Sequence, residues 1–289
     1  MTFEQDVTIV SAFTSNGGGG NPAAVVTDAE GLSDAAMQAI ATRTGLSETA
    51  FLSPSTKATY RLDFFTPTRR IAHCGHATVA AFGLLEASGV LPPGAYSKET
   101  IDGLRNIRLD RGYAGMQQLP PRYHPIEAGA VQDALGISER DIDPRFAPII
   151  VNTGNGFGLV GLRDEAVLAG LRPNLSAVDI LSEHHDLVGF YPFVAGSGTT
   201  FDAVTRMFAP RYGINGEAAT GMAAGPLACL LHRAGLVSDI ARIGQGAFMP
   251  APSPSALEVR LTIEGDTIVD VLAGGSTSVL GRRVVRYTV

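Results

Sequence analysis

Two segments of the chain share one pattern of apolar and polar positions. Each begins with an apolar stretch that ends in aromatic-x-Pro, at residues 65–67 and 208–210. Because proline cannot continue the hydrogen bonds of a sheet, this pattern predicts that a strand ends there. A glycine-led run rich in Ala and Leu follows, at residues 75–89 and 221–235. Each run predicts a buried helix closed by a left-handed glycine.

The two helical runs align without a gap, and the second begins about half a chain length after the first. A repeat of that length indicates two similar domains and not a solenoid, whose period is about 20–50 residues. We expect one domain over residues 1–120, completed by a C-terminal strand at 279–289, and a second over 121–278. Clefts between domains are common ligand sites, so we expect the active site there.

The remaining pattern predicts many short strands for each long helix. Strands are expected at residues 6–13, 22–26, 49–52, 59–65, 107–109, 112–117, 148–152, 159–162, 188–195, 201–208, 257–263, 267–273 and 283–287. Further helices are expected at residues 33–44, 130–135, 165–171 and 175–181. This balance predicts an α+β fold in which a sheet wraps around one central helix, twice.

Composition narrows the possible functions. The chain is 45% apolar and 17% charged, which is typical of a folded, core-rich protein. Its net charge of −6 gives no basic footprint for nucleic acid. No apolar run approaches the roughly 20 residues of a spanning helix, and the first residues lack the signal-peptide pattern. We therefore expect a cytoplasmic protein without a nucleic-acid or membrane partner.

The two repeated helices begin at Gly75 and Gly221, directly after Cys74 and Thr220. A helix start offers free backbone N–H groups and partial positive charge, which suit a carboxylate. The expected ligand is therefore a small-molecule carboxylate. The alternative is that both glycines only allow close helix packing.

Glu48 lies between a predicted helix and an apolar strand, among small and apolar neighbours. Partial desolvation would raise its pKa toward neutrality and fit it for taking and giving a proton. Residue statistics alone favour a different interpretation, in which Glu48 is an exposed loop residue.

Three possible metal ligands, His73, Cys74 and His76, lie within four residues. The chain has no C-x-x-C or H-E-x-x-H pattern to complete such a site, so we expect no metal. His76, next to the helix start, is better interpreted as a proton carrier. No P-loop or G-x-G-x-x-G fingerprint is present either, so no nucleotide cofactor is expected.

Several motifs together resemble the phenazine-biosynthesis PhzF-like family, within the diaminopimelate epimerase-like fold. They are GNPAAVV at residues 20–26, LSETAF at 46–51, FFTPTRRIAHCGHAT at 64–78 and RMFAPRYGINGEAATGMAAGPL at 206–227, with a weaker echo, IGQG, at 243–246. The resemblance implies two domains, each a sheet around a central helix, with the active site between them. It also implies a homodimer and no metal or organic cofactor.

The resemblance places Glu48 on the family's general acid/base and His76 on its assisting imidazole. Glu217 falls on a position that is commonly aspartate. The expected substrate-binding positions are Asn21, Cys74, Gly75, Thr220, Gly221 and Met222. Met222 departs from the family's serine and replaces a hydroxyl by an apolar thioether. This departure predicts a substrate other than the usual dihydro-hydroxyanthranilate.

The sequence therefore predicts an isomerase that shifts a double bond in a small unsaturated amino or hydroxy acid. Two alternatives stay open: a one-base racemase or epimerase that uses Cys74 or Glu48, and a binding protein that has lost the chemistry. Epimerisation by two thiols is disfavoured, because Thr220 occupies the position of the second cysteine and a hydroxyl is too weak an acid.

Overall fold

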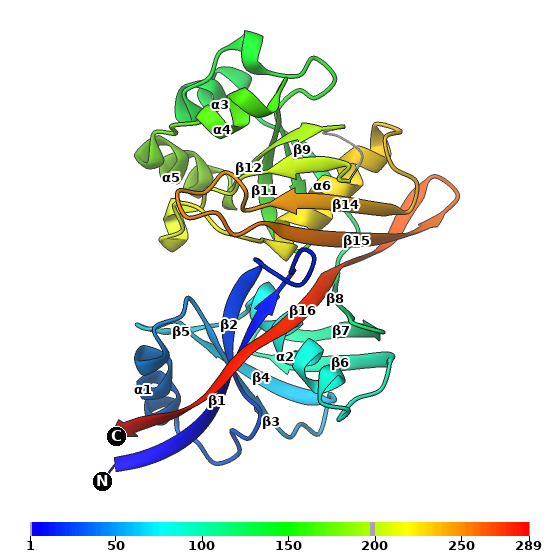
Figure 1. Cartoon of the computed structure of the whole chain (residues 1–289). Helices are drawn as coiled ribbons and strands as arrows, with labels where there is room; N and C mark the ends of the chain where they lie inside the picture. Colours follow the sequence, from blue (N-terminus) through cyan, green and yellow to red (C-terminus); the bar gives the residue numbers. More distant parts are fainter. Residues whose placement is uncertain (1, 197–199, 289) are drawn as a thin grey trace. The chain divides into compact units, whose positions relative to one another are not determined.

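The computed structural model describes residues 2–196 and 200–288. Contacts divide the chain into two compact units (Figure 1). Unit 1 comprises residues Met1–Gln117 and Gly274–Val289, and unit 2 comprises Gln118–Ala273. The domain limits expected from the sequence differ from these by a few residues.

Unit 1 is built from strands around one helix. Its elements are β1 (Thr2–Ala12), β2 (Asn21–Val26), α1 (Asp34–Thr44), β3 (Thr49–Ser53), β4 (Tyr60–Phe65), β5 (Arg70–Ile71), α2 (Gly75–Ala87), β6 (Gly94–Thr100), β7 (Gly103–Asp110), β8 (Tyr113–Gln118) and the end of β16 (Thr267–Thr288). The strand order is β1-β2-β3-β4-β6-β7-β8-β16, and β16 also pairs with β1. The strands of this unit therefore close into a ring.

Helix α2 is the core of unit 1 because its sequence is apolar on every side. Its residues are buried from Gly75 to Leu85, and it packs against β1, β2, β3 and β7. Small residues let the strands approach: a Cβ on Gly83 would collide with the side chain of Thr277 on β16. The helix ends as the sequence predicts, with Gly89 in the left-handed region at φ 72°.

Unit 2 repeats the theme with more helices. Its elements are β9 (Arg122–Pro125), α3 (Ala128–Leu135), η1 (Glu139–Asp141), β10 (Ile149–Asn152), β11 (Gly156–Gly161), α4 (Glu165–Gly170), α5 (Leu175–His184), β12 (Leu187–Ala195), β13 (Ala203–Thr205), η2 (Pro210–Tyr212), α6 (Gly221–Arg233), β14 (Ile240–Gln245), β15 (Ser255–Glu264) and the start of β16. The strand order is β16-β15-β14-β13-β12-β11-β10-β9. Helix α6 packs against β10, β11, β14 and β15, and Gly235 closes it at φ 72°.

Some sequence-based elements need correction. The expected strand at residues 201–208 shortens to β13, and the strand expected at 159–162 begins earlier, at Gly156 of β11. Strand β6 was not predicted, because its sequence, GAYSKET, is polar. The last two expected strands are one continuous β16, which in Figure 1 runs beside β1. Among the described residues, no helix combines the length and apolar character that crossing a bilayer requires.

Candidate active site

Glu48 lies in unit 1 at the end of a tightly fixed turn between α1 and β3. Gly45 ends α1 in the left-handed region at φ 69°, and its N–H donates to a helix carbonyl. The hydroxyls of Thr44 and Thr49 lie 3.1 Å apart on either side of the turn. The Ala24 N–H donates to the Glu48 carbonyl at 3.1 Å. These contacts fix the backbone from which the carboxylate projects.

Cys74 and His76 come from the start of α2. Cys74 is the N-cap residue in an extended conformation, and Gly75 is the first helical residue. The Cys74 thiol is buried with 6% of its surface exposed, and His76 is 5% exposed. The Cys74 Sγ lies 3.6 Å from the His76 Nδ1. The thiol and the imidazole therefore share one buried corner at the helix start.

The other nitrogen of His76 faces Glu48. The His76 Nε2 lies 3.2 Å from the Glu48 Oε2, and only 14% of the Glu48 side chain is exposed. The interpretation of Glu48 as an exposed loop residue is therefore wrong. The imidazole lies between a carboxylate and a thiol, with one nitrogen toward each.

One expectation about Glu48 is also wrong. Burial by itself raises its pKa, but the hydrogen bond and charge of His76, with a hydrogen bond to Ser47, lower the pKa below its ordinary value of 4.5. For His76, burial by itself lowers the pKa, but Cys74 and Glu48 raise the pKa well above its ordinary value of 6.5. The resting site therefore holds a carboxylate beside an imidazolium.

In the same cluster, burial raises the pKa of the Cys74 thiol above its ordinary value of 9.0, and the charge of His76 opposes part of that shift. One ligand atom each of Glu48, Cys74 and His76 lies within 4.8 Å of the others, so this cluster could hold a metal ion. His73, named in the sequence analysis as a possible metal ligand, is not part of this group. Its Nδ1 lies 3.2 Å from the Lys98 Nζ instead.

In unit 2 the predicted residues gather around the start of α6. The Thr220 hydroxyl donates to the Glu217 carboxylate. Gln245, at the end of β14, accepts from the Thr220 N–H at 3.0 Å. Its amide donates to the Thr220 hydroxyl at 3.0 Å and to the Glu217 carbonyl at 2.8 Å. Glu217 is thus anchored through both its backbone and its side chain.

Sequence reasoning did not identify Gln245 as a site residue. Its side chain is 2% exposed, and its Oε1 also accepts from the Tyr191 hydroxyl at 2.6 Å. The available signal was the short IGQG echo at residues 243–246. Distance in sequence hid its role, because only the pairing of β13 with β14 and the packing of α6 bring it to Thr220.

Met222 and Asn21 lie at the starts of two different elements, α6 in unit 2 and β2 in unit 1. Met222 is the second residue of α6, and its Sδ accepts from the Asn155 amide at 3.6 Å. The opening carbonyl of α6, that of Gly221, accepts from Gln118 at 2.8 Å. Asn21 is the first residue of β2, where it is 6% exposed and paired with Ala12. Their roles toward a substrate stay predictions.

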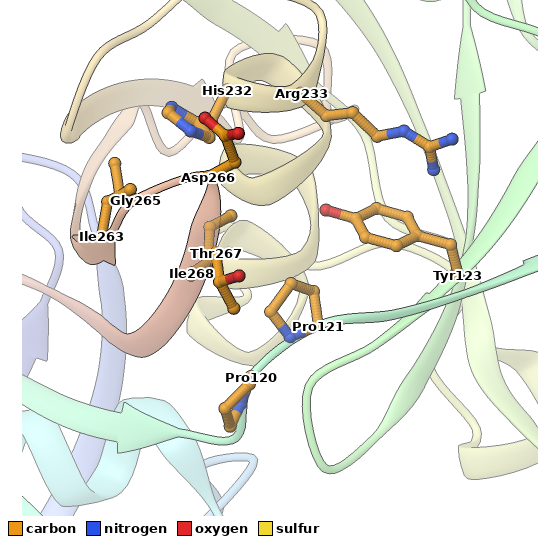
Figure 2. A pocket seen from close by; sticks show the side chains of 10 residues that line it. All are labelled: Pro120, Pro121, Tyr123, His232, Arg233, Ile263, Gly265, Asp266, Thr267 and Ile268. Carbon is orange, nitrogen blue, oxygen red and sulfur yellow. The ribbon is translucent and has the colours of Figure 1, made fainter.

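A hollow of about 610 Å³ lies elsewhere in unit 2, away from all predicted site residues. Figure 2 shows that the Arg233 guanidinium lies over the Tyr123 ring, at 4.7 Å from its centroid. Pro120 and Pro121 and the β15–β16 turn at Asp266 form the other walls. None of the residues that the sequence predicts for the site lines this hollow, so it is not the candidate active site.

Relatives that match nearly the whole chain carry the names of isomerases. The uncharacterized isomerase YddE of Escherichia coli O157:H7 is 32% identical over 282 residues, which cover 94% of this chain and 95% of YddE. The trans-2,3-dihydro-3-hydroxyanthranilate isomerase of Pseudomonas chlororaphis is 32% identical over 287 residues, covering 96% of this chain and 98% of that enzyme. The protein is thus an isomerase.

A family model described as phenazine biosynthesis-like protein matches residues 10–281. The chain belongs to this family, as the motifs predicted. The PhzF-family protein of Bacillus anthracis has the same fold, with a TM-score of 0.85 at 23% identity over 98% of this chain and 99% of that chain. A hydroxyproline epimerase of Agrobacterium vitis shares the fold at a TM-score of 0.62 and 14% identity, covering 98% and 91%.

Proposed function

We propose that the protein shifts a double bond in a small unsaturated amino or hydroxy acid, without a metal or organic cofactor, and that Glu48 is the general acid/base. The observation that carries this proposal is the buried contact between the Glu48 carboxylate and the His76 imidazole. The isomerase names of the relatives support the class of reaction.

In the proposed reaction Glu48 removes a proton from a carbon beside the double bond. The electron pair of that C–H bond forms the new double bond, and the old one opens toward a second carbon. Protonated Glu48 then returns the proton to that carbon, so atoms and electrons balance within the substrate. His76 steadies the carboxylate before the proton arrives, and the N–H groups at the start of α2 bind the substrate carboxylate.

For unit 2 we propose that Glu217 and the start of α6 orient the amine or hydroxyl of the substrate. Met222 presents a thioether where the family has serine, so this edge of the substrate is apolar. A substrate group that needs a hydroxyl partner would be left unpaired there. The proposed substrate therefore differs from trans-2,3-dihydro-3-hydroxyanthranilate in the group that faces Met222.

The test is Glu48→Gln, which keeps the shape of the side chain and cannot cycle a proton. Turnover is screened in D₂O with trans-2,3-dihydro-3-hydroxyanthranilate and a panel of small unsaturated amino acids, with deuterium incorporation read by mass spectrometry. We expect the variant to lose roughly 100-fold or more of the activity. Glu30→Gln, at an exposed glutamate, is the control. Full turnover in Glu48→Gln would contradict the proposal.

A one-base racemase is the second candidate, because the Cys74 Sγ lies 3.6 Å from the His76 Nδ1 and can exchange a proton with the imidazole. Cys74→Ser separates the two functions. The proposed isomerase keeps most of its turnover in this variant, whereas a thiol-based racemase loses it. Inversion of a stereocentre with no movement of a double bond would favour the racemase.

A further inference from the structure

Lys98 is a lysine with no exposed surface, on strand β6 of unit 1, and its side chain reaches α2. Lysine is almost never fully buried unless it is paired. Among the residues that the structure describes, no carboxylate forms an ion pair with Lys98. Its Nζ instead donates to the Thr78 hydroxyl at 2.8 Å and lies 3.2 Å from the His73 Nδ1. The ammonium also lies 5.0 Å from the centre of the Phe64 ring.

Both residues that the Lys98 Nζ contacts, His73 and Thr78, are directly connected to Cys74. His73 precedes Cys74 in the chain, and the Thr78 hydroxyl donates to the Cys74 carbonyl at 2.6 Å. When Lys98 is protonated its ammonium group can only donate, so the Nδ1 of His73 then accepts. Burial, with the charge of Lys98, lowers the pKa of His73 to about 2 and keeps it neutral.

We propose that Lys98 is a positioning residue. Its ammonium group fixes the backbone at His73 and Cys74, and this keeps the Cys74 thiol and the His76 imidazole in place beside Glu48. The kinetic part of this inference rests on the proposed function, but the geometric part does not. Thr78 and Lys98 act together: the Lys98 Nζ donates to the Thr78 hydroxyl, and that hydroxyl donates to the Cys74 carbonyl at the start of α2.

The charges around Lys98 fit this role. Burial lowers its pKa to about 7, Cys74 opposes that shift, and Arg105 on β7 adds to it. Asp102, in the turn before β7, is engaged by Arg105 at 3.0 Å. The charge of Asp102 also opposes the lowering of the Lys98 pKa, but the hydrogen bonds of Lys98 go to Thr78 and His73 at the start of α2.

The experiment measures alkylation of Cys74 by iodoacetamide, resolved by peptide mass spectrometry. Cys229, at 0% exposure in the core of unit 2, is the internal control for global unfolding. Lys98→Met and Thr78→Val should each raise the Cys74 rate about tenfold while the Cys229 rate stays unchanged. Thr78→Ser restores the hydroxyl and should return the Cys74 rate to the wild-type value. Lys57→Met, at an exposed lysine, should change nothing.

Folded Lys98→Met and Thr78→Val variants with wild-type Cys74 rates would overturn the inference, as would equal rises at Cys74 and Cys229. If Lys98→Met does not fold, the two Thr78 variants decide alone. With a substrate in hand, kcat should fall more than KM rises, and Thr78→Ser should rescue kcat. Loss of the proposed isomerase activity as a whole would leave the alkylation result standing.

Discussion

The Glu48 carboxylate and the His76 imidazole lie 3.2 Å apart in a corner that solvent scarcely reaches. Burial and pairing act in opposite directions on both groups, and pairing prevails. At rest the acid is ionised and ready to accept a proton. The same shifts favour a protonated imidazole, so the two groups carry opposite charges near neutral pH.

The pair predicts a broad pH plateau for kcat/KM. The acid limb falls below the ordinary Glu pKa of 4.5, and the alkaline limb lies above the ordinary His pKa of 6.5. The stability contribution of Glu48 is present above pH 4.5 and is lost as the pH falls through its lowered pKa. That of His76 is present below pH 6.5 and is lost as the pH rises through its raised pKa.

His76→Asn tests the origin of this plateau. Without the imidazolium, burial is the main remaining influence on Glu48, so its pKa should rise and the acid limb should move to higher pH. Carboxyl NMR titration of Glu48 and the pH profile of kcat/KM measure this shift. An unmoved acid limb would show that His76 does not control Glu48.

Gln245→Leu should destabilise the start of α6. The change leaves the Thr220 N–H and the buried Tyr191 hydroxyl without their acceptor. Each buried unsatisfied group costs about 1–3 kcal/mol, so chemical denaturation should show a loss of that order. An unfolding free energy equal to that of the wild type would contradict this account.

Met222→Ser should shift the substrate preference toward trans-2,3-dihydro-3-hydroxyanthranilate. The substitution restores the family's hydroxyl, which can pair with a polar substrate group, and removes the sulfur that Asn155 contacts. Relative kcat/KM values on this substrate and on an apolar analogue measure the shift. Met222→Leu keeps the apolar surface and should leave the preference unchanged.

Gly83→Ala should destabilise unit 1, because the added Cβ meets Thr277 inside the ring of strands. Overpacking of this kind costs about 1–3 kcal/mol. The control is Gly281→Ala. Gly281 lies on β16, the strand that carries Thr277, and has open space at its Cβ position. Thermal unfolding should separate the two variants, and equal melting temperatures would contradict the packing described here.

Local patterns were enough for the parts of the molecule that local sequence controls. The glycine-led runs predicted α2 and α6 with their left-handed ends, and the helix expected at residues 33–44 is α1, where the Oγ of the N-cap residue Ser33 accepts from the Ala36 N–H at 3.2 Å. The motifs predicted the isomerase family, which the comparisons confirmed. These successes share one reason: helix caps and turn residues act within a few positions of chain.

Tertiary structure alone decided the electrostatics. Glu48 and His76 are far apart in sequence, and the closed ring of strands around α2 brings the turn before β3 to the helix start. This contact, with a smaller effect from Ser47, reverses the pKa shift that burial alone implies for Glu48. The placement of Lys98 behind α2 and of Gln245 beside Thr220 follows from strand pairing in the same way. Free energies of charged groups depend on neighbours in space, and a linear pattern does not contain them.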